Sequence, residues 1–168
     1  MKVKFLSSIL IFIVLFSCKS HSDKHSSVFP ENLNSISVLD GSNIFSVSEN
    51  KELSVRLDSY SKETNRSIVV VTVDSILPYD DIQKYANALG NYWGVGQKET
   101  NNGLVIVFSK PLRQIGIATG LDTEKILTDS ICKSVIDSIM VPLFKNKEYS
   151  LGIKNGVDSL IEHWNKGR

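Results

Sequence analysis

The sequence predicts a layered α/β sandwich on a small mixed β-sheet, in which a parallel βαβ unit adjoins an antiparallel hairpin and about four helices flank the sheet. Residues 67–73 and 103–109 are short apolar runs rich in β-branched residues, which is typical of strands covered on both faces. A third run, residues 113–119, follows the second after a short turn and completes the hairpin. Segments with helical apolar spacing precede, separate and follow these runs.

The first half of the domain alternates helix, strand and helix. Residues 46–64 place apolar side chains at helical spacing between charged ones, so they predict an amphipathic helix before the strand at 67–73. A second helix is expected over residues 80–92, with Asp80 or Asp81 as its N-cap. The cap is favoured over a catalytic pair of carboxylates. Because this helix joins two strands, we expect the strands to be parallel, with a right-handed crossover.

The second half begins with the hairpin and ends in helices. The strand at 103–109 turns into an antiparallel strand at 113–119. An irregular acidic loop then leads to a helix over residues 130–144, in which Pro142 predicts a kink or break. A last amphipathic helix is expected over residues 149–165.

The N-terminus has the layout of a secretory signal. Lys2 and Lys4 precede an apolar run over residues 5–16, which is shorter than the roughly twenty residues that a membrane-spanning helix needs. The sequence LFSC, which ends at Cys18, resembles a lipobox, whose cysteine is acylated and becomes the first residue of the mature chain. We therefore expect a bacterial lipoprotein held to membrane lipid through Cys18, in the cell envelope, facing the periplasm or exposed on the surface.

The chain divides into a signal, a tether and one domain. Residues 1–18 form the signal with its lipobox, and the polar residues 19–34 predict a flexible tether. His21 and His25 are read as solvated tether residues rather than as metal ligands. Residues 35–166 are long enough for one domain with its own core.

Charge and motif content exclude several functional classes. The formal charge is +1, and removal of residues 1–18, which carry two lysines and no acidic residue, leaves −1, so nucleic-acid binding is not expected. The domain has no G-x-S-x-G elbow, P-loop or H-E-x-x-H motif. His163 is its single histidine, near the chain end, which leaves a catalytic triad without a base. Cys132 stands at an apolar helical position and is expected to be a core thiol.

Acidic residues are concentrated in one loop of the domain. Asp122, Glu124 and Asp129 lie in the loop after the hairpin, and the antiparallel pairing brings Asn101 and Asn102 to the same rim. Carboxylate, amide and backbone oxygens are the ligands that Ca²⁺ and Mg²⁺ prefer. The rim is therefore a candidate metal site.

A structural explanation of the same residues stays open. Thr128 or Asp129 also suits the N-cap of the next helix, and Glu124 can pair with Lys125 in solvent. The Asn102-Gly103 pair also suits a turn. Spacing alone favours this explanation, since no EF-hand pattern is present.

An ordered set of signals along residues 34–164 resembles the TPM domain. It combines Trp-Gly-x-Gly, a polar spacer, Asn-Gly before an apolar strand, and Leu-Thr-Asp after a glycine. The segments that carry it are Asp40, 67–76, 81–86, 91–96, 101–104, 119–120 and 127–129. The resemblance implies a Rossmann-like α/β sandwich. It also implies either a divalent-cation-binding accessory module for membrane complexes or an acid phosphatase.

Carried over position by position, the resemblance adds Asp40 to the candidate ligands, although Asp40 also suits a turn or N-cap. Its polar pattern falls on Asp40, Trp93, Asn101, Asn102, Gly120 and Asp129, and Trp93, Gly94, Gly103 and Gly120 form its structural motif. Leu121-Asp122-Thr123 stands where many relatives have a second glycine, which bears on how closely the backbone can approach an ion.

Three functions follow as hypotheses. The leading one is an accessory lipoprotein that binds Ca²⁺, or Mg²⁺, at the rim and serves an unidentified envelope protein. The second is a metal-assisted phosphatase, for which Lys98, Arg113 and Lys125 are the nearby cations. The third is a protein-interaction domain without a metal.

Overall fold

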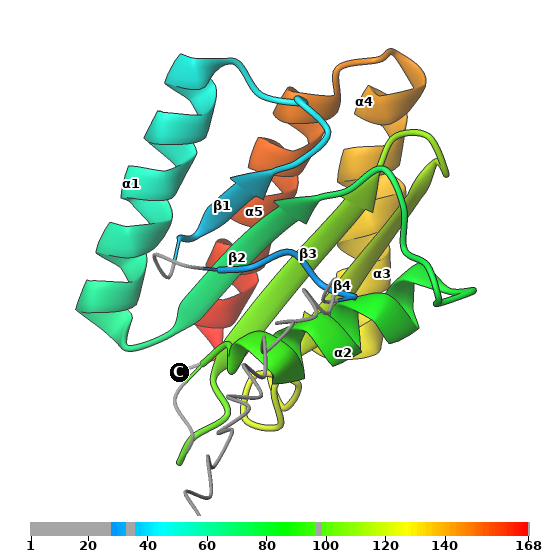
Figure 1. Ribbon diagram of the computed structural model, residues 1–168. Helices are drawn as coiled ribbons and strands as arrows, with labels where there is room; N and C mark the ends of the chain where they lie inside the picture. Colours follow the sequence, from blue (N-terminus) through cyan, green and yellow to red (C-terminus); the bar gives the residue numbers. More distant parts are fainter. Residues whose placement is uncertain (1–27, 33–35, 97–98, 168) are drawn as a thin grey trace, which may run out of the picture.

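The computed structural model describes residues 28–32, 36–96 and 99–167 (Figure 1). The signal, Cys18, both tether histidines and Lys98 lie outside the described residues. Within the described part, no helix combines the length and apolar character needed to cross a membrane.

A four-stranded mixed sheet forms the centre of the domain. Its strands are β1 (Val38–Asp40), β2 (Ser67–Thr72), β3 (Gly103–Ser109) and β4 (Gln114–Thr119), in the order β1-β2-β3-β4. The first three are parallel, and β4 pairs antiparallel with β3. The predicted mixed sheet is thus confirmed, with β1 as an addition, because three residues are too few to show a periodic pattern.

Two long helices begin at identifiable caps. In α1 (Val47–Thr64), Ser46 and Glu49 form a capping box. In α2 (Ile82–Trp93), the Asp81 side chain accepts a hydrogen bond from the backbone N–H of the third helical residue. Asp81 is therefore the N-cap that the sequence allowed.

The helix expected over residues 130–144 is divided. It consists of α3 (Asp129–Val135), the π-helical turn η1 (Ile136–Met140) and α4 (Val141–Lys145), with Pro142 in the first turn of α4. Proline has no N–H for the helical ladder, so the chain changes its hydrogen-bond pattern just before it. The last helix, α5 (Tyr149–Lys166), follows.

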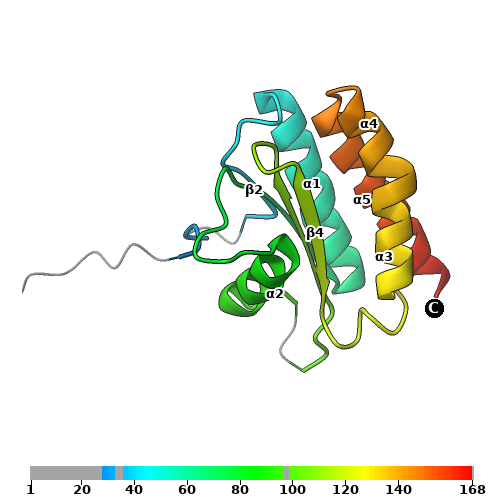
Figure 2. The same cartoon turned by 90° about the vertical axis from the view of Figure 1, so that its right-hand side faces the viewer.

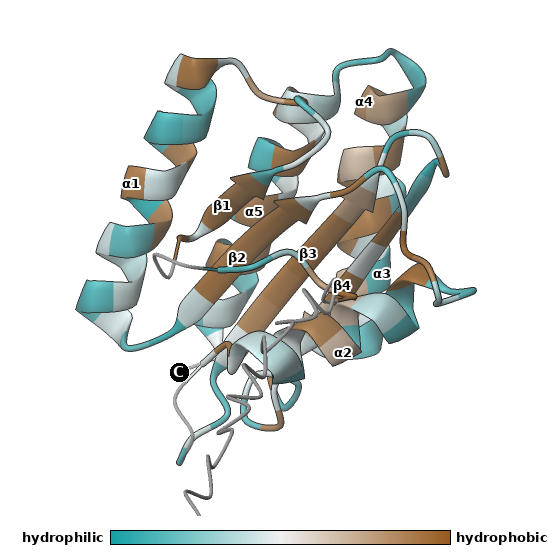
Figure 3. Ribbon diagram, in the orientation of Figure 1, coloured by the Kyte–Doolittle hydropathy of each residue, from teal (hydrophilic) through white to brown (hydrophobic). Residues whose placement is uncertain are grey.

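Each face of the sheet has its own core. Ile68 and Val70 of β2 point to the face covered by α1, α3, η1 and α5, whereas Val69 and Val71 point to the face covered by α2 (Figure 2). The strands are apolar on both faces and the outer helix surfaces are polar (Figure 3). This is the layered sandwich that the unbroken apolar runs predict.

The two crossovers have opposite hands. The β2-α2-β3 connection is right-handed, as expected. Because α1 lies on the other face while the strand order advances in the same direction, the β1-α1-β2 connection is left-handed. The connections that follow β1 and β2 therefore run to opposite faces of the sheet.

Candidate functional site

A groove of about 930 Å³ runs along the outer edge of β4. One wall is the exposed surface of α2, and the other comes from the loop after β4 together with α3 and η1. The polar and charged side chains that line it are Gln83, Asn87, Asn91, Asn101, Thr119, Glu124, Asp129, Lys133 and Asp137.

The backbone of β4 forms the floor of this groove, and one side chain from α2 occupies its edge. The Gln83 amide donates from Nε2 to the Ile117 carbonyl oxygen (2.7 Å) and accepts from the Ile117 N–H at Oε1 (3.1 Å). This pair of bonds imitates a neighbouring strand. By the antiparallel alternation, the N–H and C=O groups of Ile115 and Thr119 also point outward.

Three of the predicted ligands line one end of the groove: Asn101, Glu124 and Asp129. The Asn101 carbonyl oxygen already accepts the Asp122 backbone N–H at 3.3 Å. Asp129 starts α3, whose N-cap is Thr128, so the capping explanation holds for Thr128. The carboxylates of Glu124 and Asp129 belong to no ion pair within the described residues.

Two predicted ligands are engaged elsewhere. Asp122 is absent from the groove lining and pairs with Lys125 in solvent at 3.0 Å. Asn102 is 8% exposed, and its Nδ2 donates to the Asn65 carbonyl oxygen. The backbone carbonyl oxygen of Asn102 accepts a hydrogen bond from the Ser67 backbone N–H at 3.2 Å. Asn102 thus fastens the start of β3 to the start of β2.

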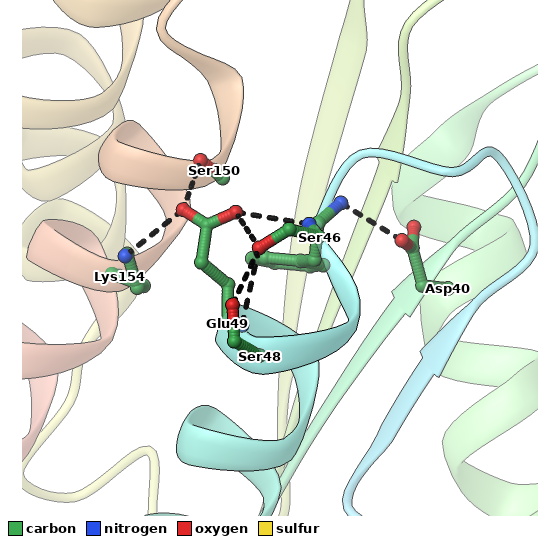
Figure 4. Close-up of polar contacts among 7 residues, drawn as sticks. Asp40, Ser46, Ser48, Glu49, Ser150 and Lys154 are labelled. Atoms are coloured by element: carbon green, nitrogen blue, oxygen red, sulfur yellow. Dashed lines mark hydrogen bonds and ion pairs between the residues drawn. The ribbon is translucent and has the colours of Figure 1, made fainter.

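Asp40 lies at the opposite end of the sheet, which separates it from the other predicted ligands. It ends β1, whereas Asn101 precedes β3, and the seven residues of β3 span about 20 Å. Its carboxylate accepts hydrogen bonds from the N–H groups of Ile44 (2.9 Å) and Phe45 (2.8 Å, Figure 4) and from Thr72 Oγ1 (2.5 Å). Asp40 is therefore a turn-stabilising residue at the carboxyl end of β1 and not a member of the rim.

The glycine and tryptophan motif is a packing feature. A Cβ on Gly103 would lie 2.1 Å from the Val95 carbonyl oxygen, and one on Gly120 would lie 2.0 Å from the Asn101 carbonyl oxygen. Gly94 ends α2 in the left-handed conformation. The indole N–H of Trp93 donates to the Pro30 carbonyl oxygen at 2.9 Å. The motif brings the segments before and after the hairpin together at the loop end of the groove.

The electrostatics of the groove favour binding over nucleophilic chemistry. Burial raises the pKa of the Cys132 thiol to about 11, so this groove residue stays protonated at neutral pH. Lys133 pairs with Asp137 at 2.8 Å. Among the described residues, no group of three or more His, Cys, Asp or Glu side chains is arranged to hold a metal. A cation here would need backbone, amide or water oxygens beside two carboxylates.

The most distinctive groove residue, Gln83, was missed by the sequence analysis. It is an exposed glutamine in the first turn of a helix, and no spacing rule marks it. Its role depends on the distance between α2 and β4, which only the packing of the two elements sets.

Comparisons with known proteins identify the family and the fold. Residues 38–163 match the TPM domain. The N-terminal domain of a protein from P. gingivalis, solved by NMR, is 26% identical, with a TM-score of 0.70 over 77% of this chain and 82% of that one. The N-terminal domain of a Corynebacterium glutamicum protein has the same fold, with 17% identity and a TM-score of 0.58 over 78% and 81% of the two chains. No curated protein matches. The chain therefore belongs to the TPM domain family.

Proposed function

We propose that the protein is an accessory binding module of the bacterial envelope, anchored through acylated Cys18, which holds a segment of a partner protein in the β4 groove. The observation that carries this proposal is the outer edge of β4, which lies in an open groove and whose outward groups at Ile117 are bonded by the side-chain amide of Gln83 rather than by a strand. Unpaired strand edges bind extended segments through backbone hydrogen bonds.

The charge of the groove indicates which segment fits. Its lining includes three carboxylates, Glu124, Asp129 and Asp137, against one lysine, Lys133. An extended segment with basic side chains would complement this excess of negative charge.

Site-specific photo-crosslinking in bacteria that express the full-length chain tests the proposal. A crosslinker at Asn87, in the groove, is expected to give one discrete adduct, whereas one at Glu52, exposed on α1, gives none. Thr119→Pro removes an outward N–H from the edge strand and should abolish the adduct. Equal adducts from both positions, or an adduct that survives Thr119→Pro, would contradict the proposal.

A second candidate function is divalent-cation binding, with Ca²⁺ first and Mg²⁺ second. It is favoured by the position of Asn101, Glu124 and Asp129 at one end of the same groove. An ion there would order the loop after β4 and change the charge that the groove offers to a partner.

Thermal unfolding of the mature chain in EDTA, then in millimolar Ca²⁺ or Mg²⁺, tests the cation site. At a free ion concentration of 100 Kd the stabilisation is about 2.7 kcal/mol, several degrees for a domain of this size. We expect Glu124→Gln with Asp129→Asn to abolish the shift, and Asp122→Asn, outside the groove, to retain it. If neither cation changes the melting temperature, the cation site is ruled out and a metal-free interaction domain remains.

Metal-assisted phosphatase chemistry has weaker support. Of the cations considered for phosphate, Lys125 is paired with Asp122, and Arg113 lines a different pocket at the hairpin turn. The groove lysine, Lys133, is paired with Asp137. The groove therefore offers a phosphate little positive charge.

A further inference from the structure

A second pocket, of about 400 Å³, lies at the hairpin end of β4, away from the predicted rim. Three aromatic rings line it: Phe108 from β3, Phe144 from α4 and Tyr149 from α5. Their centroids are 4.7 to 5.8 Å apart, so they form one contiguous apolar surface.

Four cationic side chains surround these rings: Lys110, Arg113, Lys145 and Lys147. No carboxylate lines the pocket, and none of the four cations is in an ion pair within the described residues. The whole chain is nearly neutral, with 19 basic and 18 acidic residues, so this is a local concentration of positive charge. Lys110 Nζ already lies over the Tyr149 ring, 5.3 Å from its centroid.

Two of these cationic residues, Arg113 and Lys147, have an unusual backbone conformation. Arg113 has a φ of 54° and Lys147 a φ of 66°. In this left-handed region glycine is the low-energy residue, whereas long side chains are strained. Both positions nevertheless carry a cation, and both line the same pocket. Strained backbone conformations of this kind cluster at ligand-binding sites.

We propose that this pocket binds an amphiphilic anion, a fixed negative charge on an apolar body. The apolar body lies against Phe108, Phe144 and Tyr149, and the cations of Arg113 and Lys147 contact the charge. Phosphate, sulfonate and carboxylate groups meet the charge requirement. A lipid headgroup or a free small molecule can supply such an anion.

Calorimetric titration of the mature chain, with Cys18→Ser to keep it free of lipid, tests the site with naphthalene-2-sulfonate. We expect saturable binding that weakens with added salt, and much weaker binding of the neutral 2-naphthol. Arg113→Gly and Lys147→Gly should each weaken binding about tenfold while making the protein no less stable, because glycine relieves the left-handed backbone. Asn43→Gly, at another left-handed position (φ 52°), is the matched control and should bind as the parent does.

Vesicles identify the source of the anion. Retention of the protein on phosphatidylglycerol vesicles but not on phosphatidylcholine vesicles, lost in the double glycine variant, assigns a lipid headgroup. Sulfonate binding without vesicle retention assigns a free anion. No saturable binding of the sulfonate, equal binding of the naphthol, or unchanged affinity in both glycine variants would overturn the proposal. None of these results depends on the β4 groove.

Discussion

A single carboxylate, Glu49, fastens two helices together. It completes the capping box of α1 through the Ser46 N–H (2.9 Å) and reaches α5 through Ser150 Oγ (2.9 Å) and Lys154 Nζ (3.2 Å), as Figure 4 shows. The backbone hydrogen bond from Ser46, followed by the side-chain bonds, lowers its pKa from 4.5 to about 2. Each of these contacts favours the charged form.

This pKa shift predicts how stability depends on pH. Because the pKa is lower in the folded state, the contribution of Glu49 is fully present above pH 4.5 and is lost as the pH falls toward 2. With allowance for solvent screening, we expect Glu49→Gln to cost about 1–2 kcal/mol at neutral pH and little at pH 2. Urea unfolding at several pH values measures this, with Glu52→Gln on the same helix as the control. An equal cost at every pH contradicts it.

Gly103 leads to a second prediction at the residue scale. Its missing Cβ makes room for the Val95 carbonyl oxygen, which is part of the backbone and has little freedom to move. We expect Gly103→Ala to destabilise the fold by about 2–3 kcal/mol. At Gly94 no heavy atom lies within 4 Å of a built Cβ, so Gly94→Asn, which tolerates the left-handed conformation, should cost far less. Denaturant midpoints of the two variants compare these costs.

At the scale of elements, β4 is an edge strand protected by the helix beside it. The Gln83 amide hydrogen-bonds both the N–H and the C=O group of Ile117. At this residue a side chain of α2 therefore takes the place of the backbone of a neighbouring strand. A partner segment would have to displace this exposed side chain and take over its two hydrogen bonds to Ile117.

Gln83→Ala should therefore open the edge. We expect amide hydrogen exchange at Ile117 to become faster and the free energy of unfolding to fall by about 1 kcal/mol. Crosslinking yield in the groove should rise, since no side chain competes with the partner. Lys84→Ala, at the neighbouring exposed position of α2 outside the groove lining, is the control. If Ile117 exchange is unchanged, the hydrogen bonds to Gln83 do not protect the edge.

At the scale of the whole molecule, residues 28–32, which belong to the predicted tether, pack against α2 and the loop before it. Phe29 stacks against Tyr79, Tyr85 and Tyr92 with ring centroids 5.2 to 5.8 Å apart, next to the Pro30 contact with Trp93. About ten residues separate Phe29 from Cys18, a reach of at most about 35–40 Å. An anchor at Cys18 would therefore hold the α2 side of the domain close to the membrane.

The anchor itself gives a prediction at this scale. Cys18→Ser is expected to move the protein from the membrane fraction to the soluble fraction and to abolish labelling by a fatty-acid analogue. Cys132→Ala, at the buried second cysteine, should leave both unchanged. Membrane retention of Cys18→Ser would argue against lipidation as the anchor.

The sequence determined the elements that are long or strongly patterned, because burial on one or two faces leaves a periodic trace. It predicted the three long helices, the three longer strands, the hairpin and the family, narrowed the cap of the second helix to Asp80 or Asp81, and gave as one helix what is divided into α3, η1 and α4. It did not predict β1, whose three residues are too few for a pattern.

Only the tertiary structure decided what the polar residues do, since their roles depend on distances between elements that are far apart in the chain. It placed Asp40 in a turn at the other end of the sheet, left Glu124 and Asp129 in the groove, and paired Asp122 with Lys125. It also brought Gln83 to the edge of β4, and gathered four cations from the hairpin, the end of α4 and the turn after it around one aromatic pocket. The local spacing of residues in the sequence does not indicate such contacts, because they form only when the layers pack together.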